Sequence, residues 1–344
     1  MKLFNLESLV RPNIWNLKPY SSARDDFQGS KGVFLDANEN PYGSLNRYPD
    51  PRQKELKVAL SELKEIPTEN IFIGNGSDEV IDLTYRIFAN PGKDSVLICP
   101  PTYGMYEVSA NINDIKIVNI PLLSNFQLNI DAVLEKIKND SSIKLIFICS
   151  PNNPTGNSLK NINILLDDFQ GIVVLDEAYI DFCKDKTFVP KIFTYPNLVV
   201  MQTFSKAWAL AGARVGIAIS QKEIIALFNK VKPPYNISRL NMNAALDAIS
   251  MKRKKSVCVS NITNEREKLI DELKKLSIVK KIYPSDANFL LVQFSNANHI
   301  YNQLIDKNII TRNRHLQVEN CIRITVGTPN ENYLLMAELK NLDA

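Results

Sequence analysis

One lysine stands alone in an apolar stretch of the chain. Lys206 lies in TFSKAWALAGARVG (203–216), where the next charged residue is Arg214. Lysine is seldom placed among apolar residues without a reason, and at a ligand site its amine can form an imine with an aldehyde. The run LVVMQ before it predicts a strand that ends just ahead of the lysine. Lys206 is therefore a candidate for covalent chemistry on a carbonyl group.

Two more polar side chains follow predicted strands. Asp176 ends the very apolar start of VVLDEAYIDF (173–182), where a carboxylate needs a nearby cation or an edge position. Asn153 lies in SPNNPTGN, directly after the run IKLIFIC. Ligands of open α/β sheets bind at the carboxyl ends of the strands. Taken singly, the Asp176 motif can also be explained as a strand that leaves the core. The Asn153 motif is explained equally well by a plain turn and by a ligand contact.

The segment IFIGNGSDEVIDL (71–83) has the features of a phosphate site. It places a strand, then two glycines, then Ser77 and Asp78 at the start of an amphipathic helix. Backbone N–H groups at a helix N-terminus bind anions. Taken alone, the segment is better explained as a capped helix after a tight turn. Glu79 in place of a third glycine argues against a dinucleotide fingerprint.

Together these groups meet the needs of pyridoxal phosphate. The aldehyde needs Lys206, and the pyridine nitrogen needs a carboxylate such as Asp176. The ring oxygen needs donors, and the phosphate needs helix N–H groups, a hydroxyl and an arginine. Tyr103, in the loop PPTYGMY, could cover a flat ligand, although core packing is the usual role of such a ring. Tyr179 supplies a second phenol near the same strand ends.

The elements that must position these residues form an α/β pattern. Helical stretches such as EVIDLTYRIF lie between short β-branched runs, several of which are continuous, as expected of strands buried on both faces. This alternation predicts a large α/β domain with a mainly parallel central sheet flanked by helices. The runs span residues 95–99, 115–120, 143–149, 171–178, 198–204 and 215–220.

The pattern changes after about residue 235, where the two prolines of KPPYNIS stop regular structure. A long charged helix then leads into NFLLVQF, another helix, CIRITV and a final helix, which predicts a smaller α+β domain. We expect residues 1–30 to form an N-terminal arm or small-domain segment, residues 31–235 the large cofactor-binding domain, and residues 236–344 the small domain.

Composition narrows the class of protein. The chain has 344 residues, enough for two unequal domains, and a mild net charge of +4. Its one basic run, residues 252–255, lacks interleaved aromatic residues and favours a solvated helix face over a nucleic-acid site. Five scattered cysteines, the absence of a secretory start and the absence of any long apolar run predict a cytoplasmic protein without a membrane span.

SPNNPTG, DEAY and SKAWALAGARVG, in this order, resemble the fold type I pyridoxal-phosphate aminotransferases, and the match spans residues 70–330. Within that group the chain is most similar to the histidinol-phosphate aminotransferase family, over nearly its whole length. The segments that carry the closer similarity are NLKPYSSAR, LDANENPYG, NRYPDP, GNGSDE, PPTYGMY and CIRITVGTP.

The resemblance implies a role for each site residue. Lys206 would hold the cofactor covalently, and Asp176 would pair with the pyridinium nitrogen. The other cofactor contacts would be Asn153 and Tyr179 on the ring oxygen, Tyr103 on the ring face, and Ser77, Asp78, Ser205 and Arg214 on the phosphate. Tyr48 would reach that phosphate from a neighbouring subunit, which implies a homodimer. Substrate anions would be bound by Arg323, Arg312 and Tyr20.

The implied reaction transfers an amino group between glutamate and imidazole acetol phosphate, in histidine biosynthesis, by a ping-pong mechanism. Aromatic amino acid aminotransferases and phosphate-ester amino acid decarboxylases share the same catalytic residues, so both stay open as alternatives. A non-catalytic binding module that kept the fold is a third. Arg314 follows Arg312 so closely that either could be the arginine that binds the substrate phosphate.

Overall fold

Seven strands form the larger of two sheets in the computed structural model, which describes residues 4–20, 23–26 and 32–343. Their order is β1-β7-β6-β5-β4-β2-β3. Neighbouring strands are parallel except β7, which runs antiparallel to both β1 and β6. The prediction of a mainly parallel central sheet is therefore confirmed. The strands span Ile71–Asn75 (β1), Ser95–Ile98 (β2), Lys116–Asn119 (β3), Ile143–Cys149 (β4), Ile172–Asp176 (β5), Leu198–Thr203 (β6) and Val215–Ile219 (β7).

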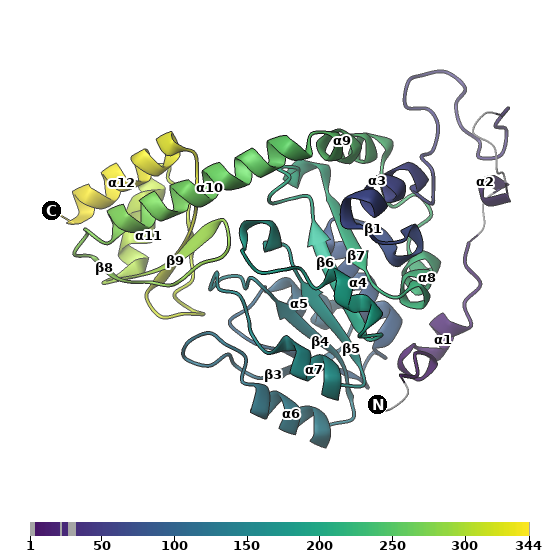
Figure 1. The fold of residues 1–344 in the computed structure, drawn as a ribbon, viewed down its shortest axis with the longest axis horizontal. Helices are drawn as coiled ribbons and strands as arrows, with labels where there is room; N and C mark the ends of the chain where they lie inside the picture. The colour runs from purple at the N-terminus through teal and green to yellow at the C-terminus, as the bar shows by residue number, and fades with distance from the viewer. Residues whose placement is uncertain (1–3, 21–22, 27–31, 344) are drawn as a thin grey trace.

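Helices cover both faces of this sheet (Figure 1). Apolar residues of α4 (Ser77–Phe88), α5 (Met105–Ile112) and α8 (Lys222–Val231) pack on one face. Those of α3 (Lys54–Lys64), α6 (Ile130–Asn139), α7 (Ile162–Asp168) and α9 (Arg239–Ser250) pack on the other. Both faces of the strands are thus buried, which explains why the runs in the sequence are continuous rather than alternating.

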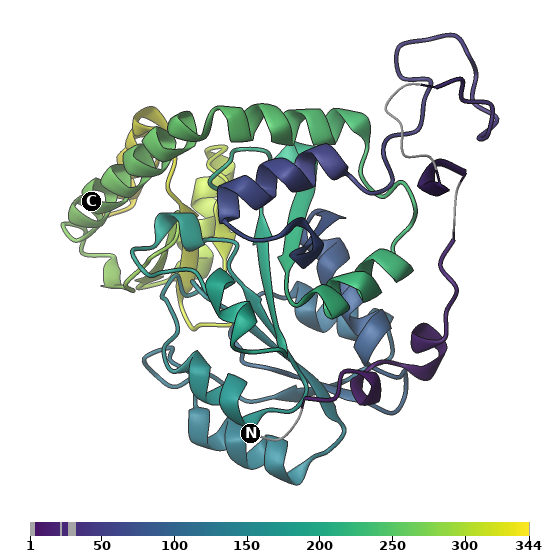
Figure 2. The same cartoon turned by 45° about the vertical axis from the view of Figure 1, so that its right-hand side comes forward.

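A second, antiparallel sheet has the order β10-β11-β9-β8. It lies at the far end of the long helix α10 (Lys252–Leu273) from α9, as Figures 1 and 2 show. Its strands and helices are β8 (Val279–Ile282), β9 (Phe289–Phe294), α11 (Ala297–Asp306), β10 (Arg312–Asn313), β11 (Cys321–Thr325) and α12 (Pro329–Asp343). The predicted smaller α+β part is present after residue 235, while the boundaries 1–30, 31–235 and 236–344 stay a prediction.

The N-terminal segment begins with a 3-10 helix, η1 (Glu7–Leu9), and α1 (Pro12–Trp15), which pack against the large domain. Lys230 Nζ on α8 donates hydrogen bonds to the carbonyls of Ile14 and Trp15, at 3.2 and 2.7 Å. Helix α2 (Ala23–Asp26) follows, and the segment from residue 32 to the start of α3 projects from the body (Figure 2). The other 3-10 helices are η2 (Thr68–Asn70), η3 (Ile180–Phe182), η4 (Val189–Phe193) and η5 (Ala211–Ala213).

Two expectations on helices are met. The basic run 252–255 forms the first turn of α10. Among the residues that the structure describes, no helix is both long and apolar enough to cross a membrane.

Two backbone segments approach each other closely where β7 passes the start of α4. Gly76 N donates to the Arg214 carbonyl at 2.8 Å. A Cβ atom on Gly216 would lie 2.4 Å from both the Gly76 carbonyl carbon and the Ser77 nitrogen. These are backbone atoms, so no flexible side chain can move aside, and only glycine fits at position 216.

We therefore expect Gly216→Ala to lower the free energy of unfolding by about 2 kcal/mol or more, because it overpacks a rigid site. Gly104→Ala is the matched control, since a Cβ there meets nothing within 4 Å. Denaturant unfolding followed by circular dichroism measures both variants. Equal stability of the two variants would contradict the close approach.

Candidate active site

A cavity of about 410 Å³ opens at the carboxyl ends of β4, β5 and β6. It gathers most of the site residues predicted from sequence, although they lie far apart along the chain. Small-domain residues close one side of it. The cavity is lined by Ser77, Asp78, Tyr103, Cys149, Asn153, Asp176, Ala178, Tyr179, Thr203, Ser205, Lys206, Ala211, Arg214, Arg312, Arg314 and Arg323.

Strand register places the acidic group of this cavity. In the parallel pair β4–β5, Cys149 and Asp176 are direct partners. Side chains of a strand alternate between the two faces, so Asp176 points to the same face as Val174 and Ile172. That face is covered by α4 and α5. The carboxylate therefore emerges beneath the first turns of these helices.

The Asp176 carboxylate is 3% exposed and each of its oxygens accepts one hydrogen bond. Tyr106 Oη donates to Oδ2 at 2.6 Å, and the Ala178 N–H donates to Oδ1 at 2.9 Å. Burial raises the pKa of Asp176 to about 6, while the two hydrogen bonds and the Lys206 ammonium act in the opposite direction.

Lys206 follows β6 and reaches into the cavity. Its side chain is exposed and lines the cavity, although its neighbours in the sequence are apolar. Its ammonium lies 5.6 Å from the centre of the Tyr179 ring. The surrounding protein lowers the pKa of Lys206 chiefly by desolvation, and the charge of Arg323 lowers it further. The carboxylates of Asp176 and Asp78 partly oppose this shift.

The start of α4 provides an anion cradle. Ser77 and Asp78 are the first residues of the helix, whose first backbone N–H groups have no partner within the helix. Arg214 Nη2 forms an ion pair with Asp78 Oδ2 at 3.1 Å, and Tyr103 Oη donates to Asp78 Oδ1 at 3.2 Å. The Ser205 hydroxyl lies 3.0 Å from that of Thr203 on the neighbouring wall.

Three arginines from the small sheet form the opposite wall. Arg323 on β11 is the direct ladder partner of Arg312 on β10, and Arg314 lies two residues beyond Arg312. Arg323 Nη1 donates to Asn153 Oδ1 at 2.5 Å, and its guanidinium lies 5.3 Å from the Phe289 ring centre. Burial, followed by the charges of Arg323 and Arg312, lowers the pKa of Arg314 to about 10. Both arginines that the sequence could not separate thus line the cavity.

Two predicted residues lie elsewhere in this single chain. Tyr48 stacks on Tyr235, with ring centres 4.4 Å apart, and is half exposed. Tyr20 is 73% exposed and lines a different hollow, beside Lys57 and Lys230. Their assigned roles in binding stay predictions.

Sequence reasoning missed three residues of the site. Tyr106 holds the Asp176 carboxylate, and Cys149 and Thr203 line the cavity. Tyr106 stood inside the quoted loop PPTYGMY, but Tyr103 was chosen as the ligand-facing ring. Tyr103 lies just before α5 and Tyr106 lies in its first turn, so no helical spacing in the sequence relates the two rings. Cys149 and Thr203, the last residues of two strands, could have been found by the same rule that located Asp176.

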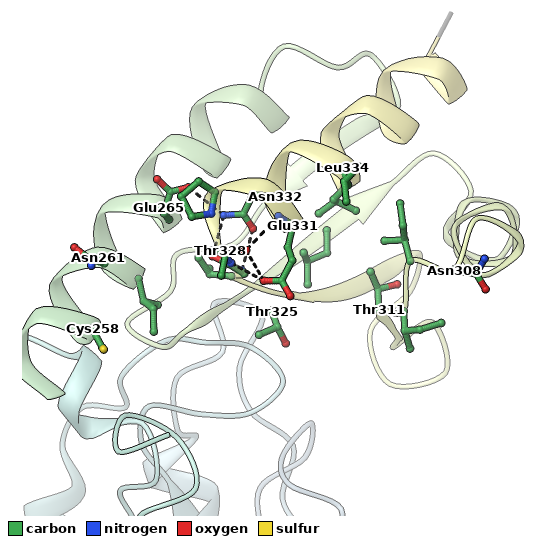
Figure 3. A pocket seen from close by; sticks show the side chains of 18 residues that line it. Cys258, Asn261, Glu265, Asn308, Thr311, Thr325, Thr328, Glu331, Asn332 and Leu334 are labelled. Atoms are coloured by element: carbon green, nitrogen blue, oxygen red, sulfur yellow. Dashed lines mark hydrogen bonds between the residues drawn. The ribbon is translucent and has the colours of Figure 1, made fainter. Parts of the chain in front are cut away.

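A larger cleft of about 800 Å³ lies on the small domain between α10 and α12 (Figure 3). Glu265 of α10 and Glu331 and Asn332 of α12 lie at it. No residue predicted for the site lines this cleft. The volume of a cavity therefore does not identify the active site. The titratable groups that gather at the strand ends identify the smaller cavity as the candidate.

The arrangement combines an amine, a buried carboxylate and an anion cradle with an excess of positive charge. Five cationic side chains line the cavity and only two carboxylates do, and one of these, Asp78, is paired with Arg214. Such a site suits a ligand that carries more than one anionic group and a carbonyl able to react with an amine.

Known proteins are similar to this chain in sequence and in fold. The sequence model of the family "Aminotransferase class I and II" matches residues 28–339. A histidinol-phosphate aminotransferase of Cytophaga hutchinsonii is 53% identical over 346 residues, which cover 98% of this chain and 99% of the relative. Another, of Christiangramia forsetii, is 49% identical over 350 residues, which cover 100% and 99%.

A solved structure adds the same fold. The histidinol-phosphate aminotransferase from Sinorhizobium meliloti in complex with pyridoxal-5'-phosphate matches with a TM-score of 0.80 at 24% identity, covering 89% of this chain and 90% of that one. The chain therefore belongs to the class I and II aminotransferases. Within that class its full-length relatives assign it to the histidinol-phosphate aminotransferase family, which confirms the resemblance seen in the sequence.

The charges around Lys206 predict the direction in which its pKa changes when one of them is removed. Arg323→Gln removes a cation that lowers the pKa of Lys206, so this pKa should rise, and the amine of the cofactor-free protein should react severalfold more slowly with trinitrobenzenesulfonate at about pH 8. Peptide mass spectrometry measures labelling at Lys206. Asp176→Asn should shift the rate the other way, and Arg253→Gln, on the exposed face of α10, should leave it unchanged. A rate that is insensitive to Arg323 would refute this account.

Proposed function

We propose that this chain is a pyridoxal-phosphate-dependent transaminase that moves an amino group between glutamate and imidazole acetol phosphate, yielding histidinol phosphate. The observation that carries the proposal is one cavity in which Lys206 and Asp176 face three arginines supplied by a second sheet. Relatives of about 50% identity over the full length are named histidinol-phosphate aminotransferases.

The residues present fit pyridoxal phosphate. A Cβ atom on Gly76 would lie 2.5 Å from Arg214 Nη2, so glycine at this position leaves room for the Arg214 guanidinium beside the first turn of α4. A cation next to the first N–H groups of a helix favours an anion at that place. Ser77, Asp78, Ser205 and Arg214 would hold the phosphate, Tyr103, Asn153 and Tyr179 the ring, and Lys206 and Asp176 its aldehyde and nitrogen.

When bound, pyridoxal phosphate supplies an aldehyde that accepts amines and a ring that withdraws electrons. Lys206 Nζ, with its lowered pKa, is suited to take the proton from the α-carbon of the amino donor as a general base. Asp176 would place a fixed negative charge beside the ring nitrogen and keep that nitrogen protonated. Closure of the cavity by small-domain residues would limit the access of water.

The substrates that alternate in this site carry different anions. Glutamate has an α-carboxylate, whereas histidinol phosphate has a phosphate ester. Arg323, which is held by Asn153 and Phe289, presents a planar guanidinium that can pair with either anion. Arg312 and Arg314 add charge on the same wall, which favours the phosphate-bearing substrate.

The complete site requires a second copy of the chain. Tyr48, on the projecting N-terminal segment, would contact the cofactor phosphate of the neighbouring subunit, so the working unit is a homodimer. Its half-exposed ring and its position outside the cavity of its own chain support this assignment. Tyr20, on the same segment, would contribute to the substrate phosphate site.

The first test of the proposal removes the amine. Lys206→Ala should abolish transamination while still binding pyridoxal phosphate noncovalently, because the phosphate and ring contacts remain. Product assays measure the first effect, and fluorescence titration with pyridoxal phosphate the second. Lys254→Ala, an exposed lysine on α10, is the control. Turnover at the unmodified rate in Lys206→Ala would overturn the mechanism.

A second test separates the two substrates. Arg312→Ala should reduce kcat/KM for the phosphate-bearing substrate about 10- to 100-fold, the loss expected for one charge-assisted contact. The half-reaction with glutamate should change less. Arg314→Ala, measured in parallel, assigns the stronger phosphate contact to one of the two arginines. Equal losses for both substrates in Arg312→Ala would exclude a specific role in phosphate binding.

Product analysis addresses the alternatives that share the same lysine. Release of a 2-oxo acid without carbon dioxide indicates a transaminase, whereas carbon dioxide indicates a decarboxylase. An aromatic aminotransferase would convert phenylpyruvate at a rate comparable to imidazole acetol phosphate.

A further inference from the structure

The buried phenol of Tyr106 has no part in the ligand contacts proposed so far. Its hydroxyl is 2.6 Å from Asp176 Oδ2, and its side chain is fully buried. We infer that Tyr106 is a positioning residue that holds the Asp176 carboxylate ionised and aimed into the cavity before any ligand binds. The functional use of that carboxylate depends on the proposed function, but the effect of Tyr106 on Asp176 does not.

The geometry leaves Asp176 little freedom. One oxygen is held by the Tyr106 hydroxyl and the other by the Ala178 N–H at 2.9 Å. The two donors belong to different elements, α5 and the loop after β5, so together they fix both the position and the tilt of the carboxylate. Hydrogen bonds to the charged form of a group favour that form, and at 3% exposure little water could replace the phenol.

An aromatic stack fixes the phenol itself. The Tyr106 ring lies on Phe147 of β4, with centres 4.9 Å apart and an interplanar angle of 24°. Phe147 stacks in turn on Tyr85 of α4 at 5.2 Å, and Tyr85 Oη donates to the Tyr106 carbonyl at 2.8 Å. Tyr103 meets Tyr106 edge-on at 5.5 Å. A ring held on several sides cannot turn its hydroxyl away from Asp176 without disturbing the core.

Core packing alone does not account for a tyrosine at this position. Phenylalanine would fill the same volume without a buried hydroxyl that needs a partner. The Tyr106 hydroxyl donates to Asp176, the last residue of β5. Other charged or titratable groups in the same cavity or beside Asp176 are Lys206, Asp78, Cys149, Tyr103, Tyr179, Arg214 and Arg323. The Lys206 ammonium opposes protonation of Asp176, and the Asp78 carboxylate favours it.

The test compares Tyr106→Phe with the unmodified chain, both without cofactor. Infrared difference spectra recorded against pH follow the carboxylate, and Asp176→Asn identifies its band. Loss of the donor should raise the Asp176 pKa, which lies at about 6 in the unmodified chain, by about one unit or more. Tyr85→Phe is a graded comparison: it keeps the Tyr106 hydroxyl and its bond to Asp176 but removes the hydrogen bond to the Tyr106 carbonyl, so its titration should shift less than that of Tyr106→Phe.

Cofactor affinity gives a second readout. With a raised pKa, Asp176 is largely protonated and neutral at about pH 6.5 but still ionised at about pH 8.5. Tyr106→Phe should therefore weaken pyridoxal phosphate binding more at the lower of these two pH values. A purely structural defect would weaken binding equally at both values. Phe147→Leu, which loosens the stack but keeps the hydroxyl, should give a smaller shift of the same sign, and it serves if Tyr106→Phe does not fold.

The possible outcomes distinguish the role of Tyr106 from the proposed function. An Asp176 titration that is unchanged in both Tyr106→Phe and Phe147→Leu would overturn the positioning role. A shifted titration in Tyr106→Phe, together with an unmodified chain that binds no pyridoxal phosphate at either pH, would uphold the role of Tyr106 and refute the proposed function.

Discussion

A charged carboxylate at the end of a buried strand must be compensated by its surroundings, and the architecture around Asp176 supplies that compensation. The parallel register of β4 and β5 brings Cys149 and Asp176 side by side, under α4 and α5. Helix α5 carries the phenol that holds the carboxylate, and the segment after β6 carries the lysine whose charge acts on it. Without these partners the cost of burying the charge would protonate the group. The charge on Asp176 therefore depends both on the register of the sheet and on the packing of the aromatic core.

A second constraint is the space left by glycines. Gly216 lets β7 pass the start of α4, and Gly76 leaves room for the Arg214 guanidinium. The antiparallel direction of β7 contributes to this, because it carries Arg214, which precedes the strand, to the edge where the parallel strands end. The cradle for an anion is thus made by backbone geometry and by one reversed strand rather than by a cluster of charges.

The second sheet adds arginines to this cavity. Its antiparallel pairing sets Arg312 directly beside Arg323. A network of contacts between the two domains then fastens the small sheet over the cavity: Asp286 bonds to Gly156 and Ser158, and Arg323 bonds to Asn153. The loop that carries Asn153 is therefore held from both domains. Any movement of the small domain would shift the arginines and that loop together.

The sequence by itself determined the α/β class, the strand ends that carry Lys206, Asp176 and Asn153, and the family, because these depend on local residue order and on buried runs that are visible in the chain. Only the tertiary structure decided that Tyr106 rather than Tyr103 holds Asp176, and that Arg312 and Arg314 share one cavity. Tyr103 lies just before α5 and Tyr106 lies in its first turn, so their roles depend on how the start of α5 is rotated against β4. That rotation is set by packing on Phe147 and Tyr85, which lie in other elements, and no local pattern encodes it.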